Sequence, residues 1–118
     1  MATGTIPKNK VNEIELMGTN TDVSAATSAN PIQINLSVPY DAFSFLVVRF
    51  ASGSADSSSS RGSLIIPYVM MGAGGFYPVY LGSTVGYVRL GGGDTTSKLK
   101  ILDKSFSTLY VRAVYGIF

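Results

Sequence analysis

The side chains that enzymes most often use for proton transfer and nucleophilic attack are scarce in this chain. The sequence contains neither histidine nor cysteine, so the usual general base near neutral pH and the thiolate nucleophile are both missing. Two carboxylates, Glu13 and Glu15, stand two residues apart, a spacing that puts both on one face of a strand. Solvated charge explains that pair more simply, and no serine stands beside a recognisable base. The residue types predict a protein that is not an enzyme and has no catalytic residue.

Glycine-rich segments offer a second kind of chemistry, the binding of phosphate or metal. The segments "GAGG" (72–75) and "GGGDTT" (91–96) lack the lysine and hydroxyl residue that end a P-loop, and strand patterns follow them instead of a helix. Tight turns explain them better. Asp22, Asp94 and Asp103 could supply oxygen ligands to calcium, but loop aspartates generally form their own turns. We therefore predict no metal and no cofactor.

Tyrosine offers a third kind of chemistry, adhesive contact. The chain has seven tyrosines and six phenylalanines, and a tyrosine on a charge-poor sheet provides contact area together with a hydroxyl group. Alternatively, the rings fill the seam between two sheets. Any ligand contact is expected from the loops 19–30, 51–62 and 91–96 and from nearby tyrosines, through hydrogen bonds and stacking against neutral sugars. The candidate ligand or receptor contacts are Arg61, Tyr77, Tyr80 and Asp94.

These side chains must be positioned by strands, because the apolar pattern is β-like almost throughout. Short segments alternate between apolar and polar residues, with turn formers between them, which is typical of a sandwich or barrel. We predict an all-β fold, an antiparallel, jelly-roll-like β-sandwich of about eight strands. The predicted strands are 11–18, 31–38, 43–50, 63–71, 76–81, 84–90, 97–102 and a last one from 109 to the end.

Individual strands carry more specific expectations. In 31–38, strict alternation predicts that Ile32, Ile34, Leu36 and Val38 face the core. The segments 43–50 and 63–71 are nearly continuous apolar runs, which predicts burial on both faces. Proline cannot donate to a strand ladder, so Pro67 predicts an edge or a bulge.

The terminal segment "SFSTLYVRAVYGIF" (105–118) is unusual because chain ends are generally polar and frayed. An apolar ending of this kind is expected to be held by a sheet, a second sheet or another subunit. Alternation predicts two faces, one with Leu109, Val111, Ala113 and Tyr115 and the other with Tyr110, Arg112, Val114 and Gly116.

Composition limits the class of protein. The 118 residues fit one β-sandwich domain, 11–118, preceded by an extended arm, 1–10, and 51–62 is predicted to be a mobile loop. Charged residues make up 14%, against roughly 25% in ordinary globular domains. The nine basic residues are scattered and the net charge is +2, which predicts no nucleic-acid partner. No apolar run predicts membrane insertion or a secretory signal.

Several of these segments together resemble a known kind of domain. The order "IELMGTNTD", "IQINLSVPYDAFSFLVVRF" and "LYVRAVYGIF" is similar to the small C-terminal β domain of bacteriophage tail-fibre, baseplate and related virion proteins. The resemblance implies a virion structural protein, made in the host cytoplasm, that forms homotrimers and contacts other virion proteins and a host-surface glycan or protein. It supplies no catalytic residue. The corresponding positions are Leu16, Gly18, Ile34, Leu36, Phe43, Leu46, Val111, Val114, Tyr115, Gly116 and Ile117.

Three functions follow from these expectations. The first is a virion component, displayed outward as a fibre or receptor-binding domain or as a head-decoration protein. The second is a stand-alone carbohydrate-binding module with Tyr77 and Tyr80 as its platform. The third is a small hydrolase, whose activity would depend on one carboxylate because no other base is available.

Overall fold

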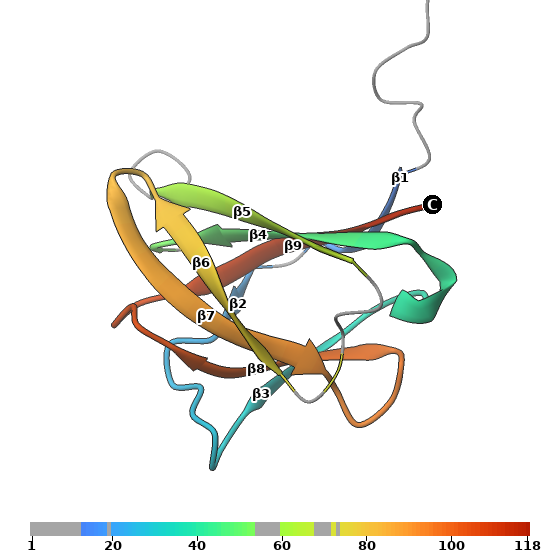
Figure 1. Cartoon of the computed structure of the whole chain (residues 1–118), viewed down its shortest axis with the longest axis horizontal. Coiled ribbons are helices and arrows are strands. Elements are labelled where there is room, and N and C mark those ends of the chain that lie inside the picture. The colour runs from blue at the N-terminus through green and yellow to red at the C-terminus, as the bar shows by residue number, and fades with distance from the viewer. Residues whose placement is uncertain (1–12, 19, 54–59, 68–71, 73) are drawn as a thin grey trace, which may run out of the picture.

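Two antiparallel sheets form the protein, which is described by a computed structural model (Figure 1). The structure describes residues 13–18, 20–53, 60–67, 72 and 74–118. The predicted arm, 1–10, therefore lies outside the described residues, as do residues 54–59 of the predicted loop 51–62 and residues 68–71 of the predicted strand 63–71. The described strands are β1 (Glu13–Met17), β2 (Thr21–Asp22), β3 (Ile32–Asn35), β4 (Phe45–Ala51), β5 (Arg61–Pro67), β6 (Gly75–Leu81), β7 (Thr84–Gly92), β8 (Lys98–Lys104) and β9 (Tyr110–Ile117).

The five-stranded sheet has the order β1-β9-β4-β5, and β2 also pairs with β9. The terminal strand β9 is thus central, with β4 on one side and β1 and β2 on the other. The prediction that the apolar chain end is docked is confirmed, and the element that holds it is a sheet of the same chain. Phe118, just beyond β9, packs its ring 4.9 Å from that of Phe43.

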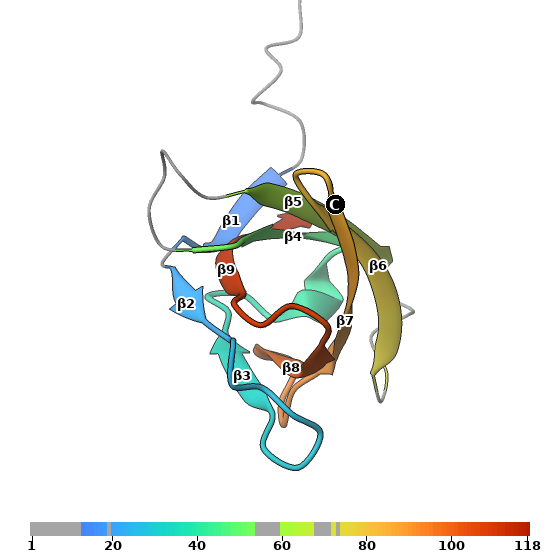
Figure 2. The ribbon, with the colours of Figure 1, turned by 90° about the vertical axis from the view of Figure 1, so that its left-hand side faces the viewer.

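The four-stranded sheet has the order β3-β8-β7-β6. Strands β6, β7 and β8 follow one another along the chain, and each pairs with the next, whereas β3 reaches β8 from far away in the sequence. Figure 2 shows how the two sheets curve around a shared interior. At one side of the sandwich the edge strands β5 and β6 approach each other, and the Gly82 backbone N–H donates to the Arg61 carbonyl at 3.3 Å.

The core fills the space between the sheets and confirms the all-β sandwich. In 31–38 the predicted inward set is correct, because Ile34 and Leu36 are buried and Ile32 and Val38 pack against the core. The described residues include no buried polar or charged residue, so apolar burial is the main stabilising term. The largest fully buried side chains are Phe50, Leu46, Ile66, Leu90, Leu99, Ile101 and Leu109.

Burial on both faces was the wrong prediction for 43–50 and for the described part of 63–71. In β4 and β5 the side chains alternate between the core and solvent, and Phe45 and Ile65 are 42% and 63% exposed. The prediction rested on unbroken apolar composition, which does not show whether a second layer covers the outer face. Pro67 does lie in an edge strand, as predicted, because β5 ends the sheet.

The predicted faces of the terminal strand are correct only for its first half. The β4–β9 register passes from Arg49 opposite Ala113 to Phe50 opposite Val111, so Arg112 is the extra residue of a β-bulge. Beyond a bulge the alternation shifts by one residue. Val111 and Val114 therefore both belong to the core cluster.

Two small elements were not predicted from the sequence. Strand β2 lies within 19–30, which we expected to be entirely loop, and its two residues pair with β9. The 3-10 turn η2 (Tyr40–Ala42) follows Pro39 and buries Tyr40. Both are too short to produce a periodic apolar pattern.

Candidate functional site

The outer face of the four-stranded sheet carries a strip of exposed aromatic and apolar side chains on the β6–β7 hairpin. The register sets Pro78 opposite Tyr87 and Tyr80 opposite Val85, so these pairs point to the same face. Phe76 and Tyr87 form an edge-to-face pair with ring centroids 5.4 Å apart. We call this the aromatic strip; it comprises Phe76, Pro78, Tyr80, Val85 and Tyr87.

The most outward members of the aromatic strip are not shielded by the rest of the chain. Phe76 is 63% exposed and Tyr80 is 64% exposed. Aromatic side chains of this size usually bury their area in a core or an interface. The hairpin that holds them is paired along its whole length, from Gly75 opposite Leu90 to Leu81 opposite Thr84. The strip is therefore a surface of rings on a rigid support.

Polar groups border the strip on the side of β8. The Tyr87 hydroxyl donates to an Asp103 carboxylate oxygen at 3.2 Å. The guanidinium of Arg89 lies 5.4 Å from the centroid of the Phe76 ring, and its Nη1 donates to the Ser28 hydroxyl at 3.1 Å. Partial burial raises the pKa of the Tyr87 hydroxyl above its usual value, and the neighbouring Asp103 carboxylate raises it further. Tyr87 is thus a protonated donor at neutral pH, with a fixed orientation.

Tyr77 and Tyr80, two of the predicted contact residues, do not form a common platform. Tyr80 belongs to the exposed strip, whereas Tyr77 lies opposite the buried Val88 and packs against the core. Three positions separate them, and an odd spacing places two strand residues on opposite faces. The proposed pair of tyrosines is therefore corrected to Tyr80 with Phe76 and Tyr87.

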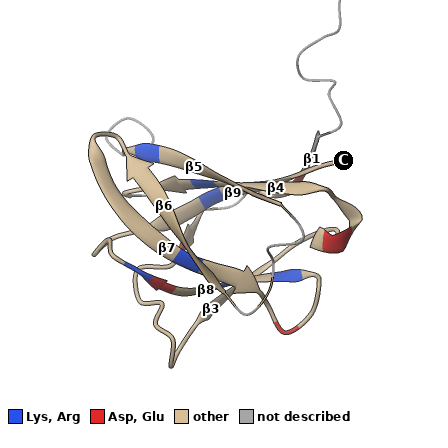
Figure 3. Cartoon of the chain, viewed as in Figure 1, with Lys and Arg blue, Asp and Glu red and all other residues tan. Residues whose placement is uncertain are grey.

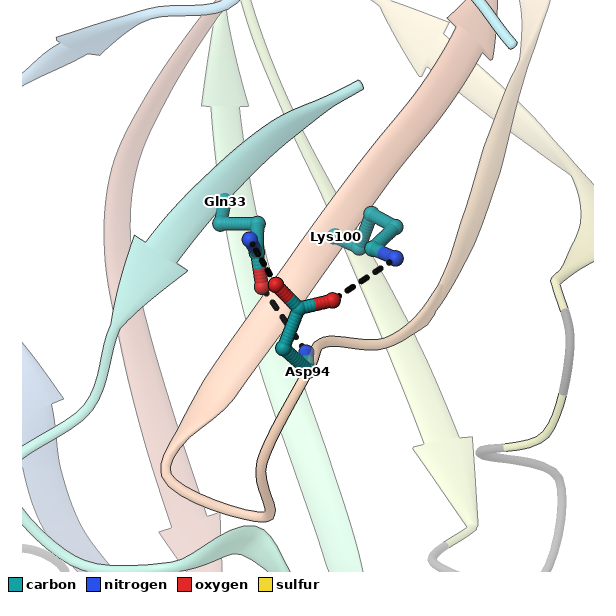
Figure 4. A network of polar contacts seen from close by, with 3 residues as sticks. All are labelled: Gln33, Asp94 and Lys100. Carbon is teal, nitrogen blue, oxygen red and sulfur yellow. Dashed lines mark hydrogen bonds and ion pairs between the residues drawn. The ribbon is translucent and has the colours of Figure 1, made fainter. Parts of the chain in front are cut away.

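Asp94, a third predicted contact, serves a structural role in the β7–β8 turn (Figure 4). Its carboxylate accepts hydrogen bonds from Gln33 Nε2 at 2.8 Å and from Lys100 Nζ at 3.3 Å. The Asp94 backbone N–H donates in turn to Gln33 Oε1 at 2.8 Å. The hydrogen bond from Gln33, followed by that from Lys100 and its charge, holds the pKa of this carboxyl below its usual value. These hydrogen bonds link the β7–β8 turn, through Asp94, to Gln33 of β3.

The other two aspartates considered as calcium ligands are likewise engaged in local contacts. Asp22 accepts a hydrogen bond from the Ser24 backbone N–H at 2.9 Å. Hydrogen bonding from the Ser24 side chain, followed by that from its backbone, lowers the pKa of the Asp22 carboxyl. Asp103 accepts from Tyr87 and from the Lys104 backbone N–H. Among the residues described, there is no group of three or more side chains that could hold a metal ion.

Arg61, the fourth predicted contact, belongs to β5 of the other sheet, where its backbone carbonyl accepts a hydrogen bond from Gly82 just after β6. Its side chain lines a groove on the five-stranded sheet together with Glu15, Arg49 and Arg112. The four predicted residues thus lie at four different places: Tyr80 in the aromatic strip, Tyr77 against the core, Asp94 in the β7–β8 turn and Arg61 at the groove. Sequence reasoning missed Phe76 as a contact residue, although the alternation of "FYPVYL" (76–81) already set Phe76 and Tyr80 on one face.

Comparisons with known proteins identified no relative, so the function is argued from the geometry described above. Within the described part of the chain, no helix is both long and apolar enough to cross a membrane. No protein-family model, curated protein or solved structure matched the sequence or the fold.

Proposed function

We propose that this chain is a non-enzymatic binding domain of a bacteriophage virion and that it contacts a neutral saccharide through the aromatic strip. The observation that carries the binding role is the exposure of Phe76 and Tyr80 on one face of a rigid hairpin. The virion assignment is supported by the resemblance described above, above all by the closing "VYGI" (114–117). A fibre, a receptor-binding domain and a head-decoration protein would all display such a surface outward.

A saccharide suits the strip because its two kinds of surface match those of the protein. The C–H face of a pyranose ring is apolar and stacks on an aromatic ring, while its hydroxyls need donors and acceptors at the edge. The rings of Phe76 and Tyr80 supply the first kind of surface. The Tyr87 hydroxyl, Arg89 and Asp103 supply the second. With charged groups only at the border, raising the salt concentration is expected to change the affinity little.

Substitutions of the ring residues test this function directly. We expect Tyr80→Ala and Phe76→Leu each to weaken binding to neutral oligosaccharides about threefold to tenfold, because the stacking surface is lost. Phe76→Leu keeps an apolar side chain, so it separates ring stacking from simple hydrophobic contact. Binding would be measured on an array of neutral oligosaccharides and then quantified by titration with the best ligand.

Tyr80→Phe is the matched control for that experiment. It keeps the ring and removes only the hydroxyl, so it is expected to bind nearly as well as the unmodified protein. Equal binding by Tyr80→Ala, Phe76→Leu and the unmodified chain would contradict the role of the strip. The same conclusion would follow if none of the neutral oligosaccharides bound.

Homotrimer formation is the second part of the proposal, and the open face of the five-stranded sheet supports it. Cross-strand pairs place Val47 opposite Ile65, and Phe45 lies opposite both Pro67 and Ile117. We call these five side chains the apolar patch. Phe45 and Ile65 are the members most open to solvent, and monomers rarely leave large contiguous apolar patches uncovered. Neighbouring copies of the chain would cover it.

The mass in solution tests this assembly. We expect light scattering at micromolar concentration to give three times the mass of one chain, and Ile65→Lys to reduce it to that of a monomer, because lysine resists desolvation in an interface. Thr84→Lys, at an exposed position in the other sheet, is the control and should leave the trimer intact.

The same measurement separates the two binding functions. A monomer that binds neutral oligosaccharides would favour the stand-alone carbohydrate-binding module. A trimer that also reattaches to phage particles stripped of it would support the virion component. A well-behaved monomer that does not attach to such particles would overturn the virion assignment.

A further inference from the structure

The groove lined by Arg61 lies on the outer face of the five-stranded sheet, whereas the aromatic strip lies on the four-stranded sheet. Its volume is about 350 Å³, within the range of small-molecule sites, roughly 300–1,000 Å³. Three arginines and one acidic residue line it, together with the hydroxyl-bearing residues Ser63 and Tyr115. It is a polar groove, unlike the apolar patch formed by other residues of the same sheet.

Strand register brings the first two arginines together. Arg49 of β4 lies opposite Ser63 of β5, and Arg61 lies opposite Ala51, two residues further along β4. Residues two apart on a strand share a face, so the two guanidinium groups project on the same side of the sheet. They come from positions that are twelve residues apart in the sequence.

Strand β9 supplies the third arginine. Arg112 is the extra residue between Val111 and Ala113, and it lines the groove beside Arg49. Val111 faces the core, so alternation along the strand points Arg112 to the outer face. The bulge then places Ala113 on that same outer side, next to Arg112 in the groove lining. Figure 3 shows basic segments of β4, β5 and β9 lying close together on this sheet.

Charge is concentrated in this groove. Among the residues that the structure describes, three arginines and one acidic residue, Glu15, line it. Arginine remains charged at any physiological pH, and its planar fork matches the geometry of a carboxylate or phosphate. Arg49 also lies over the Tyr115 ring, 5.9 Å from its centroid, which favours one orientation of the guanidinium. The groove thus presents convergent, partly oriented cationic donors.

We propose that this groove binds an acidic saccharide through its carboxylate group. The arginines would hold the carboxylate, and the Ser63 and Tyr115 hydroxyls would face the sugar hydroxyls. This site is independent of the function proposed for the aromatic strip, because it lies on the other sheet and recognises charge instead of an apolar ring face.

Titration with small probes, followed by amide NMR of the full chain, tests the proposal. Glucuronate is the probe, glucose is the neutral control of similar size, and inorganic phosphate is the alternative oxyanion. We expect glucuronate to shift resonances of β4, β5 and β9 around the groove, and glucose to leave them unchanged. Raising the salt concentration from low to physiological should weaken glucuronate binding, in contrast to binding at the strip.

Charge variants test which side chains contribute to glucuronate binding. Arg49→Gln and Arg61→Gln, on different strands, are each expected to weaken glucuronate binding about tenfold, because one charge-assisted contact is lost. Glu15→Gln is expected to strengthen it about threefold by removing a repulsive carboxylate. Lys104→Gln removes the same charge from the other sheet and should have little effect. The NMR spectrum of each variant also shows whether it has folded.

Three results would overturn the proposal. One is glucose binding in the groove as well as glucuronate does. The second is Lys104→Gln weakening glucuronate binding as much as the two arginine variants. The third is phosphate binding without glucuronate binding, which would assign the groove to a phosphate-bearing group instead of a carboxylated sugar. Loss of saccharide binding at the strip alone would leave this site intact.

Discussion

A protein lacking residues 109–118 is expected to be insoluble and to show no cooperative unfolding transition. This deletion removes β9, which pairs with β1, β2 and β4 and holds the five-stranded sheet together. It also removes the fully buried Leu109, Val111 and Val114. Each such side chain contributes about 1.5–3 kcal/mol through burial, so their loss alone approaches the whole net stability of a small domain, about 5–15 kcal/mol.

The deletion has a second consequence, because the strands beside β9 lose their partner. An unpaired strand offers its backbone to other chains, which leads to aggregation. Removing residues 1–10 is the control for chain shortening. We expect that variant to unfold cooperatively, because the core of the described residues begins at Leu16. Expression, solubility and circular dichroism during heating measure both variants. A soluble, cooperatively unfolding protein without residues 109–118 would refute the central role of β9.

Gly116→Val is expected to lower the free energy of unfolding by about 3 kcal/mol and the melting temperature by about 10 °C. Gly116 is buried in β9, and a Cβ added there would lie 2.6 Å from atoms of the Phe43 ring. That ring is only 4% exposed, so it has little room to move away. A larger side chain at position 116 must therefore displace a packed aromatic ring.

The matched control is Gly72→Val, since a Cβ at Gly72 meets nothing within 4 Å. Both substitutions lower backbone entropy alike in the unfolded chain, so the difference between them reports the contact with Phe43. Phe43→Leu combined with Gly116→Val should show positive coupling, because the smaller side chain makes room for valine. Urea unfolding would measure the unmodified protein, the single variants Gly116→Val, Gly72→Val and Phe43→Leu, and the double variant. Equal stability of the two valine variants would rule out the steric explanation.

The sequence alone determined the class of fold and much of the core. Strict alternation in 31–38 identified the inward side chains correctly, because a strand with one buried face must alternate and nothing local interrupts it. The apolar ending was correctly expected to be docked, since no frayed terminus tolerates such a segment. The edge position of Pro67 followed from its missing N–H group. These are properties of a residue or a short segment, so they could be predicted without the fold.

Only the tertiary structure decided how the candidate sites are assembled. The basic residues looked scattered, yet Arg49, Arg61 and Arg112 line one groove because strand register brings β4, β5 and β9 side by side with these residues on one face. Neither register nor bulge position is encoded in a local pattern; both depend on how two distant strands pack. Likewise, the exposure of Ile65 and Phe76 depends on whether another layer covers each sheet, which an apolar run does not reveal. The strands could be predicted from short-range periodicity, whereas the surfaces on which function is proposed arise from long-range pairing.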